Sequence, residues 1–193
     1  MNFLAHFRLS CNRETLIVGN FLADFLRKAE QRALPADYQE GLSLHYAIDH
    51  FTDHHPVIRS TVRLLHPRHS KYASVILDVL LDYFLAKHWL AYHEQPLPEF
   101  RQAMYRVLEH HLPIMPQRLQ RQVPRMIEQD WLREYTDTAG LSRTFARMQH
   151  RVSKPAFFQG ISTSLTEHYA ELDRTFTTFF PDILDHVAPY CRS

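Results

Sequence analysis

The sequence predicts a single all-α domain, and three observations support that fold class. Apolar residues recur with helical spacing through almost the whole chain, whereas the alternation typical of strands is rare. Only four glycines occur, and no Asn-Gly or Asp-Gly pair marks a hairpin. The 193 residues are enough for one sizeable core, so we expect one compact multi-helix domain spanning 1–193.

Prolines mark most of the expected breaks between helices, because proline lacks a backbone N–H and clashes with the preceding turn. The prolines at or near these breaks are Pro35, Pro56, Pro67, Pro96, Pro98, Pro113, Pro155 and Pro181. The expected helices span 2–9, 14–29, 36–52, 56–66, 70–92, 97–111, 116–129, 139–150 and 160–180, and a short helical tail follows from 181. The helix over 70–92 is apolar on most sides, which is typical of a central helix.

Composition and charge argue against several classes of function. A formal net charge of +1 does not favour a generic binder of nucleic acid. Charged residues interrupt the most apolar stretch, 75–92, so we expect no membrane span. No signal peptide is evident, and Cys11 and Cys191 stand far apart with no disulfide framework, which is typical of a reducing compartment. We therefore expect a cytoplasmic protein.

Polar pairs one turn apart lie beside the apolar stripes of three expected helices. The pairs are Asn20 with Asp24, His45 with Asp49, and Asp78 with Asp82; Asp53 follows one turn after Asp49, and His6 stands in the first apolar turn. An unpaired carboxylate is costly to bury, so we expect a cation to compensate these groups.

Either arginine or a metal ion can supply that compensation. The arginine candidates are Arg8, Arg27, Arg59 and Arg63. A divalent metal ion compensates more completely, and the mixture of imidazole and carboxylate suits manganese, iron, magnesium or zinc. Because no thiolate stands near, a structural zinc site is not expected.

A carboxylate-rich metal site on helices typically serves either redox chemistry or phosphoester hydrolysis. A di-iron bundle uses Glu-x-x-His pairs, and neither Glu109-His110-His111 nor Glu167-His168 has that spacing. The cluster is instead dominated by aspartate. Hydrolysis is therefore the favoured chemistry, with an arginine such as Arg59 available to hold a phosphate oxygen.

Four separated motifs then resemble one known family. They are Met1 to His6, Gly19 to Phe25, Leu44-His45 with Ile48-Asp49 and Phe51 to Pro56, and Leu77-Asp78 with Asp82 to Ala86 and His88-Trp89. In this order they resemble acyl carrier protein phosphodiesterase, also called acyl carrier protein hydrolase. The resemblance is strong over 1–90 and weaker beyond, where Glu128 to Leu132 and His168-Tyr169 with Phe180-Pro181 still fit.

The resemblance implies a divergent all-α fold of the HD-type metal-dependent phosphohydrolases. The implied reaction cleaves the phosphodiester between a serine of holo-acyl carrier protein and its 4'-phosphopantetheine arm, with Mn²⁺ as the metal and Mg²⁺ or Fe²⁺ as alternatives. The HD signature is an adjacent His-Asp doublet. This chain has the reversed Asp49-His50, and the family pattern matches His45 and Asp49 instead.

The resemblance also implies roles for individual residues. The expected metal ligands are Asp24, His45, Asp49 and Asp82, with His6 and Asp78 as the next candidates. The expected catalytic residues are Asp24, His45, Asp49, Asp53 and Asp82. Asn20, Asp53 and His55 are expected to support the ligands or to handle protons. His50 and His54 are expected to matter less.

The implied partner is acyl carrier protein, a small acidic helical protein. Residues 54–77 contain no acid but carry Arg59, Arg63, Arg68 and Lys71. We expect this basic stretch to dock the acidic partner and to guide its arm, with Arg59 and Arg63 in contact. The alternative interpretation, a solvated helix face with no partner, stays open for such a stretch.

Other interpretations stay open. An HD-type phosphohydrolase of a small nucleotide or another phosphoester would need the same metal site. A non-catalytic helical binding module would have its Asp and His cluster satisfied by arginine. A di-iron oxidase ranks third.

Overall fold

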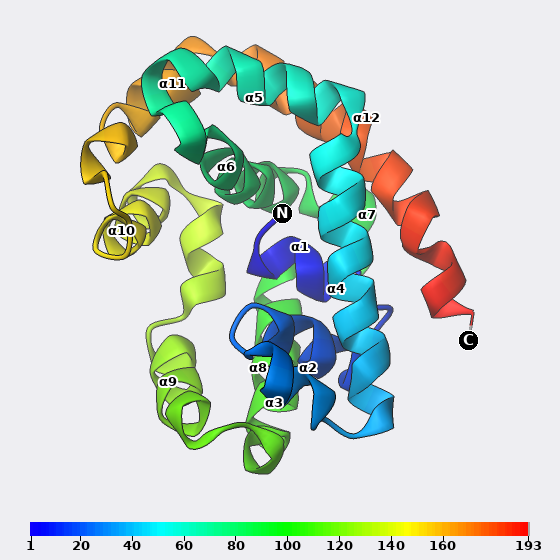
Figure 1. The fold of residues 1–193 in the computed structure, drawn as a ribbon. Helices are drawn as coiled ribbons and strands as arrows, with labels where there is room; N and C mark the ends of the chain where they lie inside the picture. Colours follow the sequence, from blue (N-terminus) through cyan, green and yellow to red (C-terminus); the bar gives the residue numbers. More distant parts are fainter. Residues whose placement is uncertain (193) are drawn as a thin grey trace.

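The structure is a computed structural model that describes residues 1–192 (Figure 1). Within that range it contains helices and turns but no strand, which confirms the all-α prediction. The α-helices are α1 Phe3–Arg8, α2 Glu14–Ala23, α3 Lys28–Arg32, α4 Ala36–His54, α5 Pro56–His69, α6 Ala73–Lys87, α7 Trp89–Tyr92, α8 Leu97–His110, α9 Gln117–Glu128, α10 Thr138–Gln149, α11 Ile161–Glu167 and α12 Tyr169–Val187. The 3₁₀ helices are η1 Ser70–Tyr72, η2 Leu112–Ile114, η3 Trp131–Thr136, η4 Pro155–Phe158 and η5 Ala188–Cys191.

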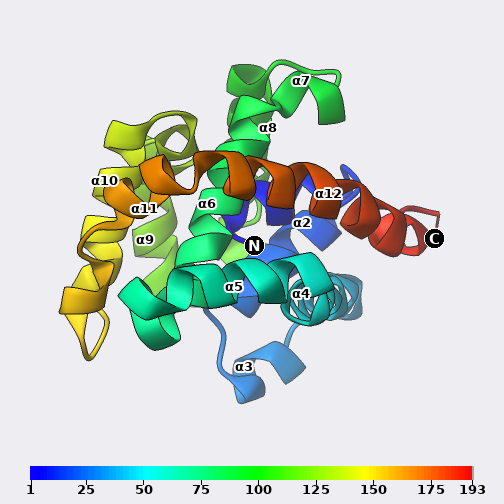
Figure 2. The same ribbon diagram turned by 90° about the horizontal axis from the view of Figure 1, so that it is seen from above.

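Helix α6 is the centre of the packing, as its apolar surface predicts. It contacts α1, α5, α12 and η3, and α5 and α12 lie side by side over it (Figure 2). Ile76, Leu80 and Phe84 of α6 are fully buried. Among the described helices, none combines the length and the apolar composition that crossing a bilayer requires.

Helices α2 and α4 approach each other closely at two glycines. A Cβ atom added to Gly19 would lie 2.3 Å from the carbonyl oxygen of Tyr38 and 2.9 Å from the Cα of Gly41, so no side chain fits between the two helices. This contact brings Asn20, the next residue of α2, beside His45 of α4.

The helix expected over 14–29 is shorter than predicted. Helix α2 ends at Ala23 and α3 begins at Lys28, because the chain turns away from the helix in between. The side chain of Gln31 donates hydrogen bonds to the carbonyl oxygens of Ala23 and Leu26, which the broken helix leaves unpaired. Asp24 is therefore the C-cap of α2, at the edge of a cleft.

Two other long helices break where no proline stands. The stretch 70–92 divides at His88 and the stretch 160–180 divides at His168. The expected end at Pro181 is wrong, because α12 continues through this proline to Val187. Proline inside a helix costs about 3 kcal/mol. The buried side chains of Phe180 and Ile183 on either side offset that cost, since each buried large apolar side chain contributes about 1.5–3 kcal/mol.

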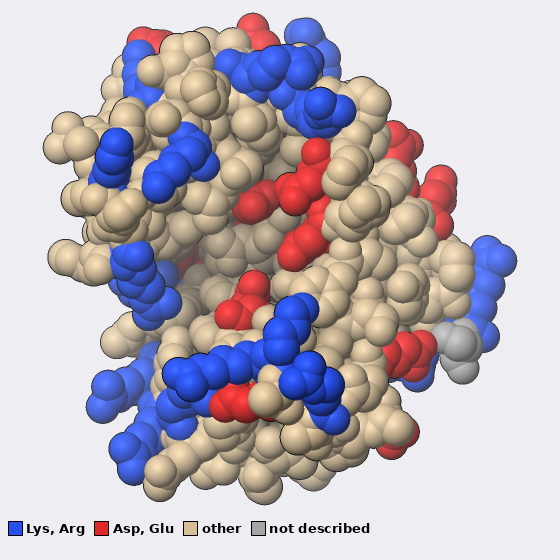
Figure 3. Space-filling view, viewed as in Figure 1, with Lys and Arg blue, Asp and Glu red and all other residues tan. Residues whose placement is uncertain are grey.

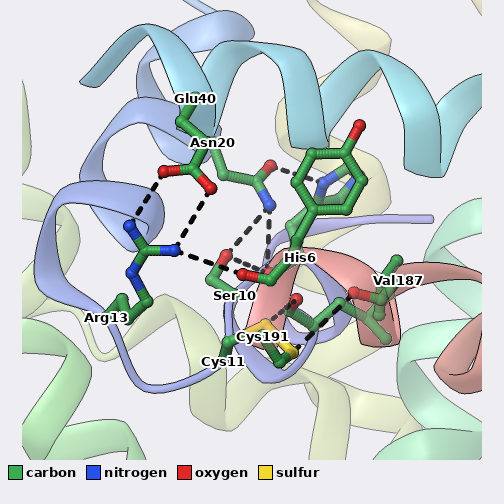
Figure 4. Close-up of a disulfide and its surroundings, with 10 residues drawn as sticks. His6, Ser10, Cys11, Arg13, Asn20, Glu40, Val187 and Cys191 are labelled. Atoms are coloured by element: carbon green, nitrogen blue, oxygen red, sulfur yellow. Dashed lines mark hydrogen bonds and ion pairs between the residues drawn. A yellow bond between two sulfur atoms is a disulfide. The ribbon is translucent and has the colours of Figure 1, made fainter. Parts of the chain in front are cut away.

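The two cysteines are not isolated, which corrects the sequence-based expectation. Cys11 follows α1, Cys191 lies in η5, and they form a disulfide with a Cα–Cα distance of 5.2 Å (Figure 4). Their 180-residue separation gave no sign of pairing, because the fold returns η5 to the loop between α1 and α2. Disulfides are typical of oxidising compartments, so a cytoplasmic location stays a prediction.

Candidate functional site

A buried asparagine on α2 holds two imidazole rings from two other helices. The Oδ1 atom of Asn20 lies 2.7 Å from Nδ1 of His6 on α1 and 3.0 Å from Nδ1 of His45 on α4. The amide nitrogen of Asn20 donates to the carbonyl oxygen of His6 and to the Oγ of Ser10 (Figure 4). These acceptors fix the amide orientation, so Oδ1 accepts a hydrogen bond from the Nδ1–H of each ring.

The Nε2 atoms of both imidazoles point at carboxylates. Nε2 of His6 lies 3.3 Å from Oδ1 of Asp49, and Nε2 of His45 lies 3.1 Å from Oδ2 of the same residue. Asp24 is also near, with Oδ1 3.6 Å from Nε2 of His45. A neutral ring protonated on Nδ1 has a lone pair on Nε2, which repels a carboxylate oxygen. This arrangement therefore requires a cation between imidazole and carboxylate, either a second proton or a metal ion.

Asp49 stays ionised in this setting. Partial burial raises the pKa of its carboxyl group, but hydrogen bonds from His45 and His6 outweigh burial and hold the pKa below its usual range. No arginine of residues 1–192 forms an ion pair with Asp49, Asp24 or Asp53. The interpretation that internal arginine satisfies these carboxylates is therefore not favoured.

A cleft of about 500 Å³ opens beside these carboxylates. One side is acidic and includes Asp24, Asp49, Asp53 and Asp78. In the space-filling view, acidic side chains gather in the central hollow, and basic side chains lie above it, to its left and below it (Figure 3). Burial and the neighbouring Asp78 raise the pKa of Asp53, so this residue can hold a proton at a higher pH than an ordinary aspartate.

Asp78 and Asp82 on α6 have other partners. Oδ1 of Asp78 lies 2.9 Å from the amine of Met1. Asp82 is fully buried, and its carboxylate accepts two hydrogen bonds from the backbone of α1 and its N-cap. The N–O distances are 2.8 Å from Leu4 to Oδ2 and 3.1 Å from Asn2 to Oδ1. Burial raises the pKa of Asp82 to about 7, although the nearby amine and backbone N–H groups oppose the shift. Asp82 thus anchors the start of α1, the helix that carries His6.

Asp24, Asp49, Asp53 and Asp78 line the cleft, and the buried His6 and His45 contact two of these carboxylates. The remaining predicted residues lie apart from this cluster. His55 contacts Asp182 of α12, with Nε2 3.0 Å from Oδ2. Arg59 and Arg63 are exposed on α5 and are absent from the walls of the cleft. His50 and His54 lie against each other with their rings tilted by 32° and the ring centroids 4.1 Å apart, and both are exposed on α4. The structure thus brings His6, Asn20, Asp24, His45, Asp49, Asp53 and Asp78 together, with Asp82 behind them.

The wall opposite the carboxylates was not predicted to have a functional role. That wall comes from η3 and the end of α10, and it includes Trp131, Arg147, Met148, Arg151 and Val152. We call these five residues the α10 wall. Trp131 falls within a motif that carried the family resemblance, and this was the only available signal.

A second group of possible metal ligands lies elsewhere. Glu14, His110 and His111 offer ligand atoms within 4.8 Å of one another. Glu14 and His110 are exposed. His111 is already engaged, since Nε2 lies 3.0 Å from Oε2 of Glu14 and Nδ1 lies 2.8 Å from the hydroxyl of Tyr38. We interpret this group as a surface ion pair that ties α2 to the end of α8.

Comparison with known proteins agrees with the motifs. The family model described as acyl carrier protein phosphodiesterase matches residues 1–183. The chain belongs to this family.

Curated relatives with the same name extend that match. The acyl carrier protein phosphodiesterase of Yersinia pestis is 31% identical over 185 residues, which cover 95% of this chain and 96% of the relative. That of Photorhabdus laumondii is 29% identical over 186 residues, or 96% and 94% of the two chains. That of Escherichia coli O6:H1 is 30% identical over 189 residues, or 97% and 98%.

The acyl carrier protein phosphodiesterase family is a family of enzymes, so the prediction of an enzyme is confirmed. No solved structure matches the chain. The relation to the HD-type fold therefore stays a prediction.

Proposed function

We propose that this protein removes the 4'-phosphopantetheine arm from holo-acyl carrier protein by hydrolysing the phosphodiester at the serine oxygen. One observation carries the proposal: two imidazoles oriented by Asn20 present Nε2 to Asp49 at the edge of a cleft. The names of the relatives supply the protein substrate.

The residues fit a divalent metal ion. His6 and His45 offer Nε2 lone pairs, and Asp49 and Asp24 offer carboxylate oxygens within 3.6 Å of one or the other of these nitrogens. This mixture of ligands suits Mn²⁺, and Mg²⁺ and Fe²⁺ are alternatives. A divalent ion held there would supply Lewis-acid polarisation of a phosphoryl oxygen. Asn20 would act as the outer partner that fixes both rings.

Asp53 is our candidate for proton transfer. It lies on α4 one turn beyond Asp49, and it faces the cleft. The serine oxygen that leaves in the reaction needs a proton, and the raised pKa of Asp53 lets this carboxyl group hold one at a higher pH than an ordinary aspartate. Asp78 maintains this property, since its charge is one cause of the raised pKa of Asp53.

Asp82 has a positioning role in this proposal. Its oxygens bind the backbone of α1 rather than facing the cleft, so we leave it out of the proposed ligand set. It secures α1, and α1 places His6 against Asp49.

The test is hydrolysis of holo-acyl carrier protein, followed by intact mass spectrometry, with and without Mn²⁺. We expect loss of the arm only with metal, and at least about 100-fold slower hydrolysis by Asp49→Ala, because loss of an outer-shell partner alone costs 10–100-fold. Asp185→Ala is the matched control, since Asp185 is exposed on α12 and outside the cleft lining. Equal rates for the parent and Asp49→Ala would overturn the proposed site.

A further inference from the structure

The α10 wall carries two arginines that differ in their surroundings. Arg147 lies on α10, and Arg151 lies just beyond the end of the same helix. Both border the cleft opposite the acidic side, which comes mainly from α4 and α6. In Figure 1, α10 lies across the face from α4, with α1 between them in the view.

Arg147 is fully engaged within the protein. It binds both oxygens of the buried Glu134, with Nη1 2.8 Å from Oε1 and Nη2 in close contact with Oε2. Its guanidinium also lies over the ring of Trp131, 4.5 Å from the centroid. Burial raises the pKa of Glu134, but hydrogen bonds from Arg147 and Thr144 outweigh burial and lower it. Arg147 thus joins η3 to α10 and keeps little capacity for a ligand.

Arg151 has the opposite character. Its side chain is exposed and borders the cleft, and it forms no hydrogen bond or ion pair with any part of the chain that the structure describes. Its backbone N–H donates to the carbonyl oxygen of Met148 at 2.9 Å, which fixes the turn at the end of α10. The cleft therefore contains a guanidinium whose five donors are all available.

The charges in the cleft indicate what Arg151 binds. Of the four carboxylates on one side, only Asp78 is paired with an amine of residues 1–192, that of Met1, so this side would repel an anion. A metal ion at His6, His45 and Asp49 would offset only part of the remaining charge. A phosphodiester carries one negative charge and two non-bridging oxygens, which match the planar fork of one guanidinium. The apolar side chains of Met148 and Val152 beside Arg151 suit the uncharged pantetheine arm.

On the basis of the proposed function, we propose that Arg151 binds the non-bridging oxygens of the substrate phosphodiester from the α10 wall. The phosphate then lies between Arg151 and the carboxylate side, and the arm extends over Met148 and Val152. Arg147 and Trp131 hold this wall in place but do not themselves bind phosphate.

Kinetics on two substrates test the proposal. We expect Arg151→Met to slow hydrolysis of both holo-acyl carrier protein and bis(p-nitrophenyl) phosphate about 10- to 100-fold, as expected for loss of charged hydrogen bonds. Arg151→Lys should keep part of the rate. Arg106→Met removes an exposed arginine of α8 outside the cleft lining, and it should match the parent on both substrates. A loss on the protein substrate alone would overturn phosphate binding and indicate contact with the partner's acidic surface.

A binding measurement separates this inference from the proposed function. Calorimetry with Mn²⁺ present compares 4'-phosphopantetheine with pantetheine, which lacks the phosphate. We expect the parent to prefer the phosphorylated compound and Arg151→Met to lose that preference, with an unchanged melting temperature. A parent that binds but does not hydrolyse holo-acyl carrier protein would overturn only the proposed function. Retention of the preference in Arg151→Met would overturn the role of Arg151.

Discussion

Helices α4 and α6 each carry a polar pair one turn apart beside the start of the chain, but the two pairs have different surroundings. On α4, the side chain of Asp49 is 43% exposed and faces two imidazole nitrogens at the cleft. On α6, Asp82 is 0% exposed and faces backbone N–H groups of α1.

The difference lies in what neutralises each carboxylate. Backbone amides at the start of a helix are permanent donors, so the hydrogen bonds of Asp82 depend on no added proton or metal ion, although burial still raises its pKa to about 7. The Nε2 atoms of His6 and His45 carry a proton only when the rings are charged, because the Nδ1–H groups of the neutral rings already donate to Asn20. The carboxylate on α4 therefore depends on a proton or a metal ion at those nitrogens, whereas the carboxylate on α6 secures the helix that carries His6.

The largest expected effect is a loss of stability when Asp82, the carboxylate that secures α1, is removed. Asp82→Ala leaves buried N–H groups of Asn2 and Leu4 without an acceptor. We expect a loss of about 3–5 kcal/mol in the free energy of unfolding, since each such group costs about 1–3 kcal/mol and a third N–H, from Ala5, is also close. Urea denaturation measures the change.

Asp49→Ala is the matched comparison for that measurement. It removes a carboxylate that is half-exposed, so we expect its free energy of unfolding to stay within about 1 kcal/mol of the parent. A large destabilisation by Asp49→Ala, or none by Asp82→Ala, would contradict the division of roles between α4 and α6.

A smaller effect, on the affinity for Mn²⁺, is expected when Asn20, which orients both imidazoles, is replaced. Asn20→Ala frees both rings to rotate and to exchange tautomers, so we expect Mn²⁺ affinity to fall about 10- to 100-fold. Asn20→Asp keeps an oxygen acceptor at the same place and should lose less. Calorimetric titration with Mn²⁺ measures both, and equal affinity in all three proteins would show that Asn20 does not orient the ligands.

The smallest effect concerns a carboxylate that arginine neutralises, Glu134 of η3. Its pKa is lowered in the folded protein, so its contribution to stability is complete above the ordinary pKa of glutamate and is lost as the pH falls through the lowered value. We expect Glu134→Gln to be less stable than the parent at neutral pH and the difference to shrink in acid. Urea denaturation at about pH 7 and about pH 4 tests the sign, and a difference that grows in acid would contradict it.

The sequence predicted most helices because their apolar stripes are local patterns. It also identified the site residues of α1, α2 and α4 as candidates, because each is a polar residue beside such a stripe. The fold brings these residues into contact with one another. It could not separate Asp49 from Asp82, because the groups that satisfy Asp82 lie 78 to 80 positions away in the chain.

Other features depended on contacts that no local pattern encodes. Pro181 lies within α12 because the buried aromatic side chains of that helix outweigh the lost hydrogen bond. Arg151 looked like any other surface arginine until the fold placed it across a cleft from four carboxylates. The pairing of Cys11 with Cys191 likewise follows from the return of η5 to the start of the chain.

That disulfide makes the polypeptide a closed ring for most of its length. A protease that cuts any loop between α2 and α12 would open the ring without releasing a fragment. The nicked protein would therefore keep its intact mass, apart from one added water, until a reducing agent separated the two pieces. Ser10, whose hydroxyl accepts a hydrogen bond from Asn20, is next to the disulfide. The site would therefore stay attached to both polypeptide fragments of the nicked molecule.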